Sequence, residues 1–123
     1  MSEEIQDSSN KELLLWLLRF RRRFRVTGTS MAPLLEPGDE ILIDPRAYRR
    51  TPPAPGDIVV ARHPYRTDLR LVKRVTEVLD DGHCLLTGDN AAESTDSRIY
   101  GPLPPERILG RVTSRLARNA NGH

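Results

Sequence analysis

The chain has 123 residues, a length that allows one hydrophobic core and one domain. Its formal net charge is only +2, and its ten prolines and eight glycines interrupt the chain at short intervals, which favours many short strands over a few long helices. A single cysteine, Cys84, excludes an internal disulfide framework and fits a reducing compartment. The scattered histidines argue against a metal site.

The strongest helix signal lies in residues 8–25. Ser9 is followed three residues later by Glu12, which is the pattern of a capping box, and an apolar run then extends from Leu13 to Leu18. This run is far shorter than the roughly 20 residues that span a bilayer. The residues before it are acidic, whereas a secretory signal begins with positive charge. We therefore expect a cytoplasmic location.

The role of this helix and of the arginines after it has two interpretations. The helix either packs on the domain or a partner, or it contacts a membrane surface as a peripheral element. Five arginines lie within positions 19–25 and would suit anionic lipid or nucleic acid, although runs of charge usually face water. We favour packing for the helix and a solvated helix end for the arginines, and we expect no nucleic-acid partner.

After Arg25 the pattern becomes that of short strands separated by turns that contain proline or glycine. Strands are predicted at 23–27, 39–44, 56–62, 69–79, 83–88 and 107–112. The fold class is therefore mainly β, with an acidic leader and short helix over 1–23, a core over 24–113 and a flexible tail over 114–123. Cys84 lies within a predicted strand, where a small buried side chain is the default interpretation.

The fourth predicted strand carries a lysine on an apolar face. On an extended strand Leu71, Lys73 and Val75 share one face, so an inward orientation would remove the Lys73 ammonium from water. Burial lowers a lysine pKa, and a neutral lysine is a competent general base toward a serine hydroxyl. Taken alone, the segment favours a Lys73 that extends to solvent, as most strand lysines do.

A serine ends the turn at residues 27–30, just after the first predicted strand. A nucleophile for peptide hydrolysis needs an exposed hydroxyl, a nearby base and donors for the developing oxyanion. The small residues before Ser30 would let a substrate backbone approach, but a serine in such a turn is usually structural. No histidine is placed for a Ser-His-Asp arrangement, so nucleophilic chemistry would have to run through Lys73.

Three segments, taken in order, resemble the successive boxes of the type I signal peptidases and their relatives, the Ser/Lys-dyad proteases. They read GTSMAPLLEPGDEILI at 28–43, LRLVKRV at 69–75 and TGDNAAESTDSRIYGPLPPERILGRV at 87–112. Lys73 follows Ser30 by 43 residues, and the resemblance covers roughly residues 24–112. It implies a compact catalytic core built on a coiled β-sheet and a serine endopeptidase activity that needs no cofactor.

The resemblance also implies a role for each matching residue. Ser30 matches the nucleophile, Lys73 the general base, and Ser94 the hydroxyl that orients the lysine amine. The amide of Ser30, with Gly28 and Thr29, would hold the oxyanion. The residues that match supporting positions are Gly88, Asp89, Asn90, Asp96 and Arg98 for structure and Thr27, Met31, Leu71 and Val72 for substrate binding.

The sequence departs from the pattern of these proteases in two respects. In some relatives the position of Gly28 is a serine whose hydroxyl helps to hold the oxyanion. Larger relatives carry membrane-spanning helices and an extra β domain, whereas only 14 residues separate Lys73 from Gly88 here. Such a small core is most similar to the nickel-type superoxide dismutase maturation protease, a subgroup inferred to remove an amino-terminal propeptide. The expected partner is therefore the precursor of a nickel-type superoxide dismutase.

Other functions remain open alongside this one. A protease of this type could instead process other precursors at a membrane surface. A non-catalytic binding module on the same fold is a further alternative, although the joint presence of Ser30, Lys73 and Ser94 argues against it. A self-cleaving, repressor-like module would need a DNA-binding domain, for which the first 25 residues are too few.

Overall fold

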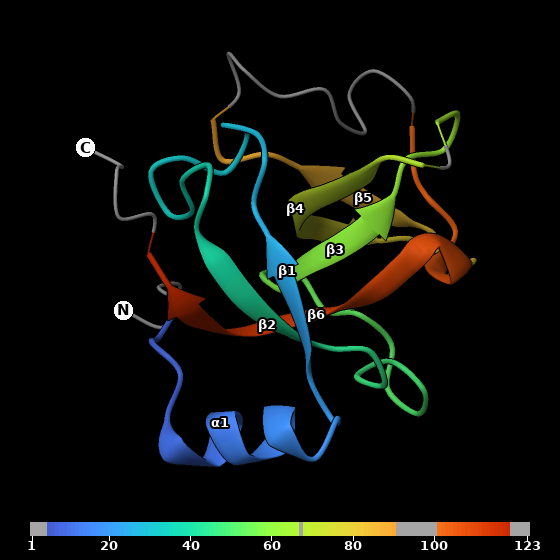
Figure 1. The fold of residues 1–123 in the computed structure, drawn as a ribbon. Coiled ribbons are helices and arrows are strands. Elements are labelled where there is room, and N and C mark those ends of the chain that lie inside the picture. The colour runs from blue at the N-terminus through green and yellow to red at the C-terminus, as the bar shows by residue number, and fades with distance from the viewer. Residues whose placement is uncertain (1–4, 67, 91–100, 119–123) are drawn as a thin grey trace.

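The computed structural model describes residues 5–66, 68–90 and 101–118. These residues form one six-stranded antiparallel sheet with a short helix near the amino terminus (Figure 1). The elements are α1 (Asn10–Leu17), β1 (Arg22–Arg25), β2 (Glu40–Asp44), β3 (Ile58–Arg62), β4 (Arg70–Val78), β5 (Cys84–Thr87), the 3₁₀ turn η2 (Pro105–Arg107) and β6 (Ile108–Ala117). The mainly β fold class is confirmed, and a strand forms in each of the six predicted segments.

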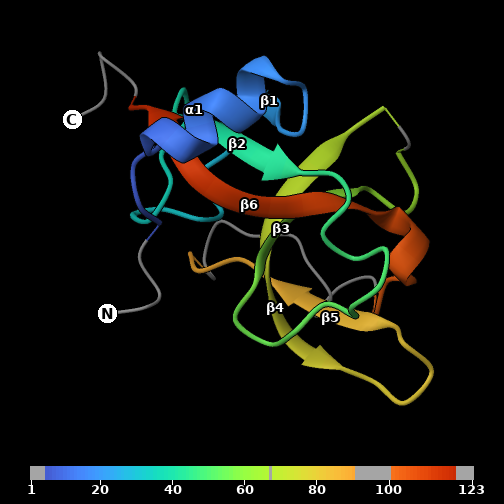
Figure 2. The same cartoon turned by 90° about the horizontal axis from the view of Figure 1, so that it is seen from below.

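The strand order in the sheet is β1-β2-β6-β3-β4-β5. The last strand of the chain therefore lies at the centre and joins the β1–β2 pair to the β3–β4–β5 meander. The ladders between β2 and β6, β3 and β6, and β4 and β5 each contain a register shift. Such irregularities bend and twist a sheet, and the curved path of β6 is visible in Figure 2.

The buried side chains form two clusters, which the alternation of β3 separates. Val60 belongs to the first cluster, together with Met31 and Leu35 from the loop between β1 and β2. Val59 and Ala61 point the other way and belong to the second cluster. The second cluster includes Cys84, Leu86 and Leu103. Cys84 is fully buried, as the sequence indicates.

The helix α1 begins as predicted but lies on the surface. The Ser9 hydroxyl accepts a hydrogen bond from the Glu12 amide at 3.2 Å and caps the helix. No residue of α1 is buried, and Leu14 and Leu17 are exposed. The helix is attached to the sheet by a polar contact, because the Glu12 carboxylate accepts a hydrogen bond from the Thr113 hydroxyl of β6. None of the described helices has both the length and the apolar character needed to cross a membrane.

The strand β6 extends to Ala117 and so includes the first residues of the predicted flexible tail. The amino-terminal segment holds this extension in place: the Ser8 amide donates to the Arg115 carbonyl, and the Arg115 amide donates to the Gln6 carbonyl, both at 2.8 Å. Ser114 and Arg115 are buried as a result. The sequence pattern missed this part of the strand because its buried side chains are polar.

Candidate active site

The turn that carries Ser30 is anchored by the two buried side chains that follow it. Met31 is 1% exposed and Leu35 is fully buried, while Ser30 itself is only half-buried. Hydrogen bonds from the Ala32 amide to the Thr29 carbonyl and from the Leu35 amide to the Met31 carbonyl, both at 3.0 Å, close the turn. The apolar anchors fix the loop and leave the serine at the surface of the core.

The Ser30 hydroxyl lies against the strand that carries Lys73. It donates to the carbonyl oxygen of Val72 in β4 at 3.5 Å. Lys73 is the next residue, lies opposite Val59 in the β3–β4 ladder and is only 2% exposed. The inward orientation of the face that Lys73 shares with Val75 is therefore correct, and the expectation of a lysine that extends to solvent is wrong. Val59 and Ala61 of the neighbouring strand β3 lie on the same face of the sheet and are buried with Val75.

The start of the third predicted box braces the same turn. The Asn90 amide donates to the Ser30 carbonyl at 2.7 Å, and its side-chain amide donates to the Thr29 carbonyl at 3.1 Å. Asp89 forms an ion pair with Arg74 of β4 at 2.8 Å. These contacts join the serine turn to β4 from a second side. Three predicted positions, Ser94, Asp96 and Arg98, lie outside the described residues.

A cavity of about 170 Å³ lies between the serine turn and the beginning of β4. Ser30 lines it together with the predicted oxyanion residue Gly28. All four of the predicted substrate-binding residues line it as well, namely Thr27, Met31, Leu71 and Val72. The structure thus brings residues from distant parts of the chain around one cavity next to the serine. The apolar side chains in this lining suit a small aliphatic group.

Gly28 has unoccupied space around it. A Cβ atom built at this position meets no heavy atom of the described residues within 4 Å, its two chain neighbours aside, and the residue is exposed. Its conformation is not one that requires glycine, because its φ does not lie in the left-handed region. The site could therefore accept a larger residue here without steric conflict.

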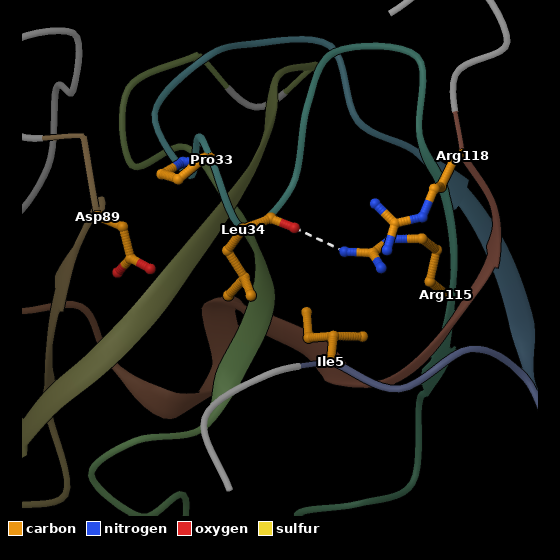
Figure 3. Close-up of a pocket in the computed structure, with 6 residues that line it drawn as sticks. All are labelled: Ile5, Pro33, Leu34, Asp89, Arg115 and Arg118. Carbon is orange, nitrogen blue, oxygen red and sulfur yellow. Dashed lines mark hydrogen bonds between the residues drawn. The ribbon is translucent and has the colours of Figure 1, made fainter. Parts of the chain in front are cut away.

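A buried ion pair supports the serine loop, and the sequence did not indicate it. Arg115 of β6 is 5% exposed and donates through Nη2 to the Leu34 carbonyl at 2.6 Å (Figure 3). Its Nε lies 3.8 Å from the carboxylate of Asp39, which is itself buried and accepts a hydrogen bond from the Glu36 amide. The pair fixes the far end of the loop to the centre of the sheet. The one feature of the sequence that could have indicated this ion pair is the proline–glycine turn just before Asp39.

The described part of the chain offers no metal site, because no three His, Cys, Asp or Glu side chains in it are grouped to hold an ion. Two titratable groups of the second cluster are shifted but do not line the cavity. Burial raises the pKa of the Cys84 thiol. Burial and a hydrogen bond to the Asp57 carboxylate raise the pKa of Tyr48. Both side chains remain neutral and play a structural part.

Comparison with known proteins is decisive at this point. Residues 13–78 and 76–117 match the model of the family described as signal peptidase, peptidase S26. The chain belongs to this family. The match includes Ser30, Lys73 and the whole six-stranded sheet, so the resemblance to signal peptidases is confirmed at the level of the family.

Individual relatives agree with the family. The chain is 33% identical to the mitochondrial inner membrane protease subunit 1 of Xenopus tropicalis, over 73% of this chain and 65% of that protein. It is 34% identical to the mitochondrial ATP-independent inner membrane protease subunit 1b of Arabidopsis thaliana, over 72% and 66%. It is 26% identical to the probable signal peptidase I-1 of Synechocystis sp., over 85% and 76%. The match spans slightly less than two thirds of either mitochondrial relative.

These relatives correct one expectation and leave another untested. The expected cytoplasmic location is wrong, because relatives named as inner membrane protease subunits point to an association with a membrane. The location was inferred from the short apolar run and the acidic leader, and neither feature excludes the peripheral membrane contact that was kept as an alternative. The narrower resemblance to the nickel-type superoxide dismutase maturation protease stays a prediction.

Proposed function

We propose that the protein is a serine endopeptidase in which Ser30 is the nucleophile and Lys73 the general base. One observation carries this proposal: the Ser30 hydroxyl lies 3.5 Å from the Val72 carbonyl oxygen, on the strand in which Lys73 is buried. Burial in a protein interior disfavours a charged ammonium, which is the condition under which a lysine accepts a proton. Membership of the peptidase family supports the same reaction type.

The reaction would proceed through an acyl-enzyme. Ser30 Oγ attacks the carbonyl carbon of the scissile peptide bond while the Lys73 amine takes the hydroxyl proton. The Ser30 amide, with Gly28 and Thr29, stabilises the resulting oxyanion. The tetrahedral intermediate collapses, the C–N bond breaks, and Lys73 returns the proton to the departing amine. Lys73 then removes a proton from water, which hydrolyses the ester and restores Ser30. Ser94 keeps its proposed role of orienting the Lys73 amine.

The sheet provides a place for an extended substrate. β1 is an edge strand, and in the described ladders β5 pairs with β4 only from Arg74 onward. Residues 70–72 of β4 therefore have one edge that faces the cavity rather than β5. A peptide in extended conformation can add to such an edge through its backbone. This position would place its scissile bond beside Ser30.

Two substrates follow from different observations. The sequence resemblance favours the precursor of a nickel-type superoxide dismutase, whose amino-terminal propeptide would be removed. The exposed leucines of α1 favour a second candidate, the processing of other precursors at a membrane surface, with α1 as a peripheral contact. The names of the mitochondrial relatives are consistent with the second candidate.

The test is cleavage of each precursor by the purified full chain, with the new amino terminus identified by mass spectrometry. We expect Ser30→Ala and Lys73→Met to abolish cleavage and to retain the native circular dichroism spectrum. The matched control is Lys11→Met, because Lys11 is the only other lysine of the chain and is exposed on α1. Cleavage by either dyad variant would disprove the mechanism. Binding of a precursor without cleavage by the wild type would favour the non-catalytic module.

A further inference from the structure

The arginine cluster near the amino terminus lies largely on a strand, whereas the sequence indicates the end of a helix. The helix α1 ends at Leu17, and Arg22, Arg23 and Arg25 belong to the strand β1. The expectation of a helix end is therefore wrong for these three residues, whereas the expectation that they face water is confirmed, because all three are exposed. They line two cavities that Arg70, the first residue of β4, also lines.

These two cavities and the cavity beside Ser30 lie in a row. The cavity beside Ser30 adjoins one of about 370 Å³, because Phe24, Thr27, Leu69 and Arg70 line both. A third cavity, of about 130 Å³, shares Phe24, Arg62 and Arg70 with the second. Phe24 and Arg70 line all three. Together the cavities form a groove between β1 and the β3–β4 hairpin, with Ser30 at one end.

The groove changes from apolar to cationic with distance from Ser30. Five exposed arginines line its two outer cavities, and we call this part the arginine groove. The five are Arg22, Arg23, Arg25, Arg62 and Arg70. Asp68 is the one acidic residue among the described residues that line the outer cavities. Arg23 and Arg25 share a single carboxylate, that of Glu40, each at 3.2 Å. The other three form no ion pair within the described residues, so positive charge is in excess.

We propose that the arginine groove binds acidic side chains of the peptide substrate, two or more residues away from the cleaved bond. This inference rests on the proposed function, because it assumes that a peptide lies in the groove with its scissile bond at Ser30. The residues next to the bond would occupy the apolar cavity, whose walls include Val26, Met31 and Val72. The next residues of an extended chain would reach the arginines. Complementary charge of this kind selects partners and speeds their association.

A peptide is a better occupant than a lipid surface. The arginines line concave spaces, and Phe24 forms part of the wall in all three. A membrane would need the charges on a convex or flat face beside the exposed leucines of α1. Arg62 and Arg70 lie on β3 and β4, and among the described residues none from α1 lines any of the three cavities. The membrane remains an outcome of the test below.

The experiment compares three peptides that span the cleavage site found for the wild type. They carry Asp-Asp, Asn-Asn or Lys-Lys at the third and fourth residues from the bond, placed before the bond in one series and after it in a second. We expect kcat/KM to fall about tenfold from the Asp-Asp to the Lys-Lys peptide in one of the two series, since each exposed ion pair contributes modestly. The difference should shrink when the salt concentration is raised to 0.5 M, because screening weakens exposed charges.

Charge reversal supplies the reciprocal test. The double variant Arg62→Glu/Arg70→Glu should invert the order and prefer the Lys-Lys peptide. The matched control is Arg49→Glu/Arg50→Glu, which makes the same change in net charge at two exposed residues outside the groove. The control should retain the preference of the wild type. The inference is overturned if the wild type shows no charge preference in either peptide series. It is also overturned if the groove variant leaves the order of the peptides unchanged.

Two further arms separate this inference from the proposed function. Binding of the same peptides to Ser30→Ala protein, measured by fluorescence anisotropy, should follow the same charge order. If the wild type cleaves nothing but this order appears, the protease assignment fails and the groove assignment stands. Vesicles with 30% phosphatidylserine form the last arm. If Arg62→Glu/Arg70→Glu loses vesicle binding and leaves the peptide order unchanged, the arginines serve a membrane and the inference is wrong.

Discussion

Gly28 is the residue at which this site departs from some of its relatives, and the structure makes the departure testable. Apart from its chain neighbours, no described residue comes within 4 Å of a Cβ at this position, so a serine fits beside them without rearrangement. Its hydroxyl would add a donor near Ser30, on the lining of the same cavity. Preorganised donors aimed at the developing oxyanion account for a large part of the rate in acyl transfer.

We therefore predict that Gly28→Ser raises kcat by about fivefold with little change in KM, since a single donor can be worth considerably more than this. Gly28→Ala is the control, because it adds the Cβ without the hydroxyl. The measurement is steady-state cleavage of the peptide that the wild type processes. If the alanine variant gains as much as the serine variant, the effect comes from the backbone and the oxyanion assignment for position 28 fails.

At the scale of elements, the serine loop depends on its attachment to β6. Arg115 reaches this loop at two points, the Leu34 carbonyl and the Asp39 carboxylate. A second carboxylate, that of Asp7, lies 3.7 Å from Arg115 Nη1, but its side chain is 76% exposed. The two acidic partners of one arginine thus differ mainly in burial, and so form a matched pair for mutation.

We predict that Asp39→Asn lowers the free energy of unfolding by about 3 kcal/mol, because it leaves the buried Arg115 without its buried counter-charge. Asp7→Asn should change it by less than about 0.5 kcal/mol, as expected for an exposed pair. Urea unfolding at pH 7 measures both values. Equal effects of the two variants would show that burial of the Asp39–Arg115 pair does not matter for the loop.

The attachment of α1 depends on pH through Glu12. Burial alone would raise the Glu12 pKa, but hydrogen bonds from Thr113 and Arg21, together with the Arg21 charge, outweigh it and hold the pKa below the usual 4.5. As the pH falls below about 4.5, the unfolded chain therefore takes up the proton before the folded protein does. The contribution of Glu12 to stability is complete above this pH and is lost as the pH falls through the folded pKa.

We predict that the midpoint of thermal unfolding declines between pH 5 and pH 3 less steeply in Glu12→Gln than in the wild type. At pH 7 the variant should be the less stable of the two, because the neutral amide binds Arg21 more weakly than the carboxylate does. Glu106→Gln, at an exposed position of η2, is the control and should follow the wild type. Parallel curves for all three proteins would show that Glu12 contributes nothing to the acid-dependent loss of stability.

At the scale of the whole molecule, local pattern predicted the elements but not the contacts between them. Apolar alternation located the six strands and placed Lys73 on an apolar face, but it favoured a lysine that extends to solvent, whereas Lys73 is buried. It did not predict the pairing of residues 6–8 with Arg115, because those partners lie more than 100 positions apart and the buried residues are polar. The position of β6 between β2 and β3 likewise depends on long-range pairing, and that position carries Arg115 to the serine loop.

The surface of α1 leads to the last prediction, which concerns the membrane association that the relatives indicate. Leu14, Leu17 and Leu18 are 55–75% exposed, and Phe20, 44% exposed, follows them. An apolar helix face followed by the exposed Arg19 suits the boundary of an anionic bilayer. We predict that the full chain sediments with phosphatidylserine vesicles and that Leu17→Ser/Leu18→Ser abolishes this binding. Tyr65→Ser, which removes an equally exposed apolar side chain distant in sequence from α1, should bind as the wild type does; the assignment of α1 fails if both variants bind alike.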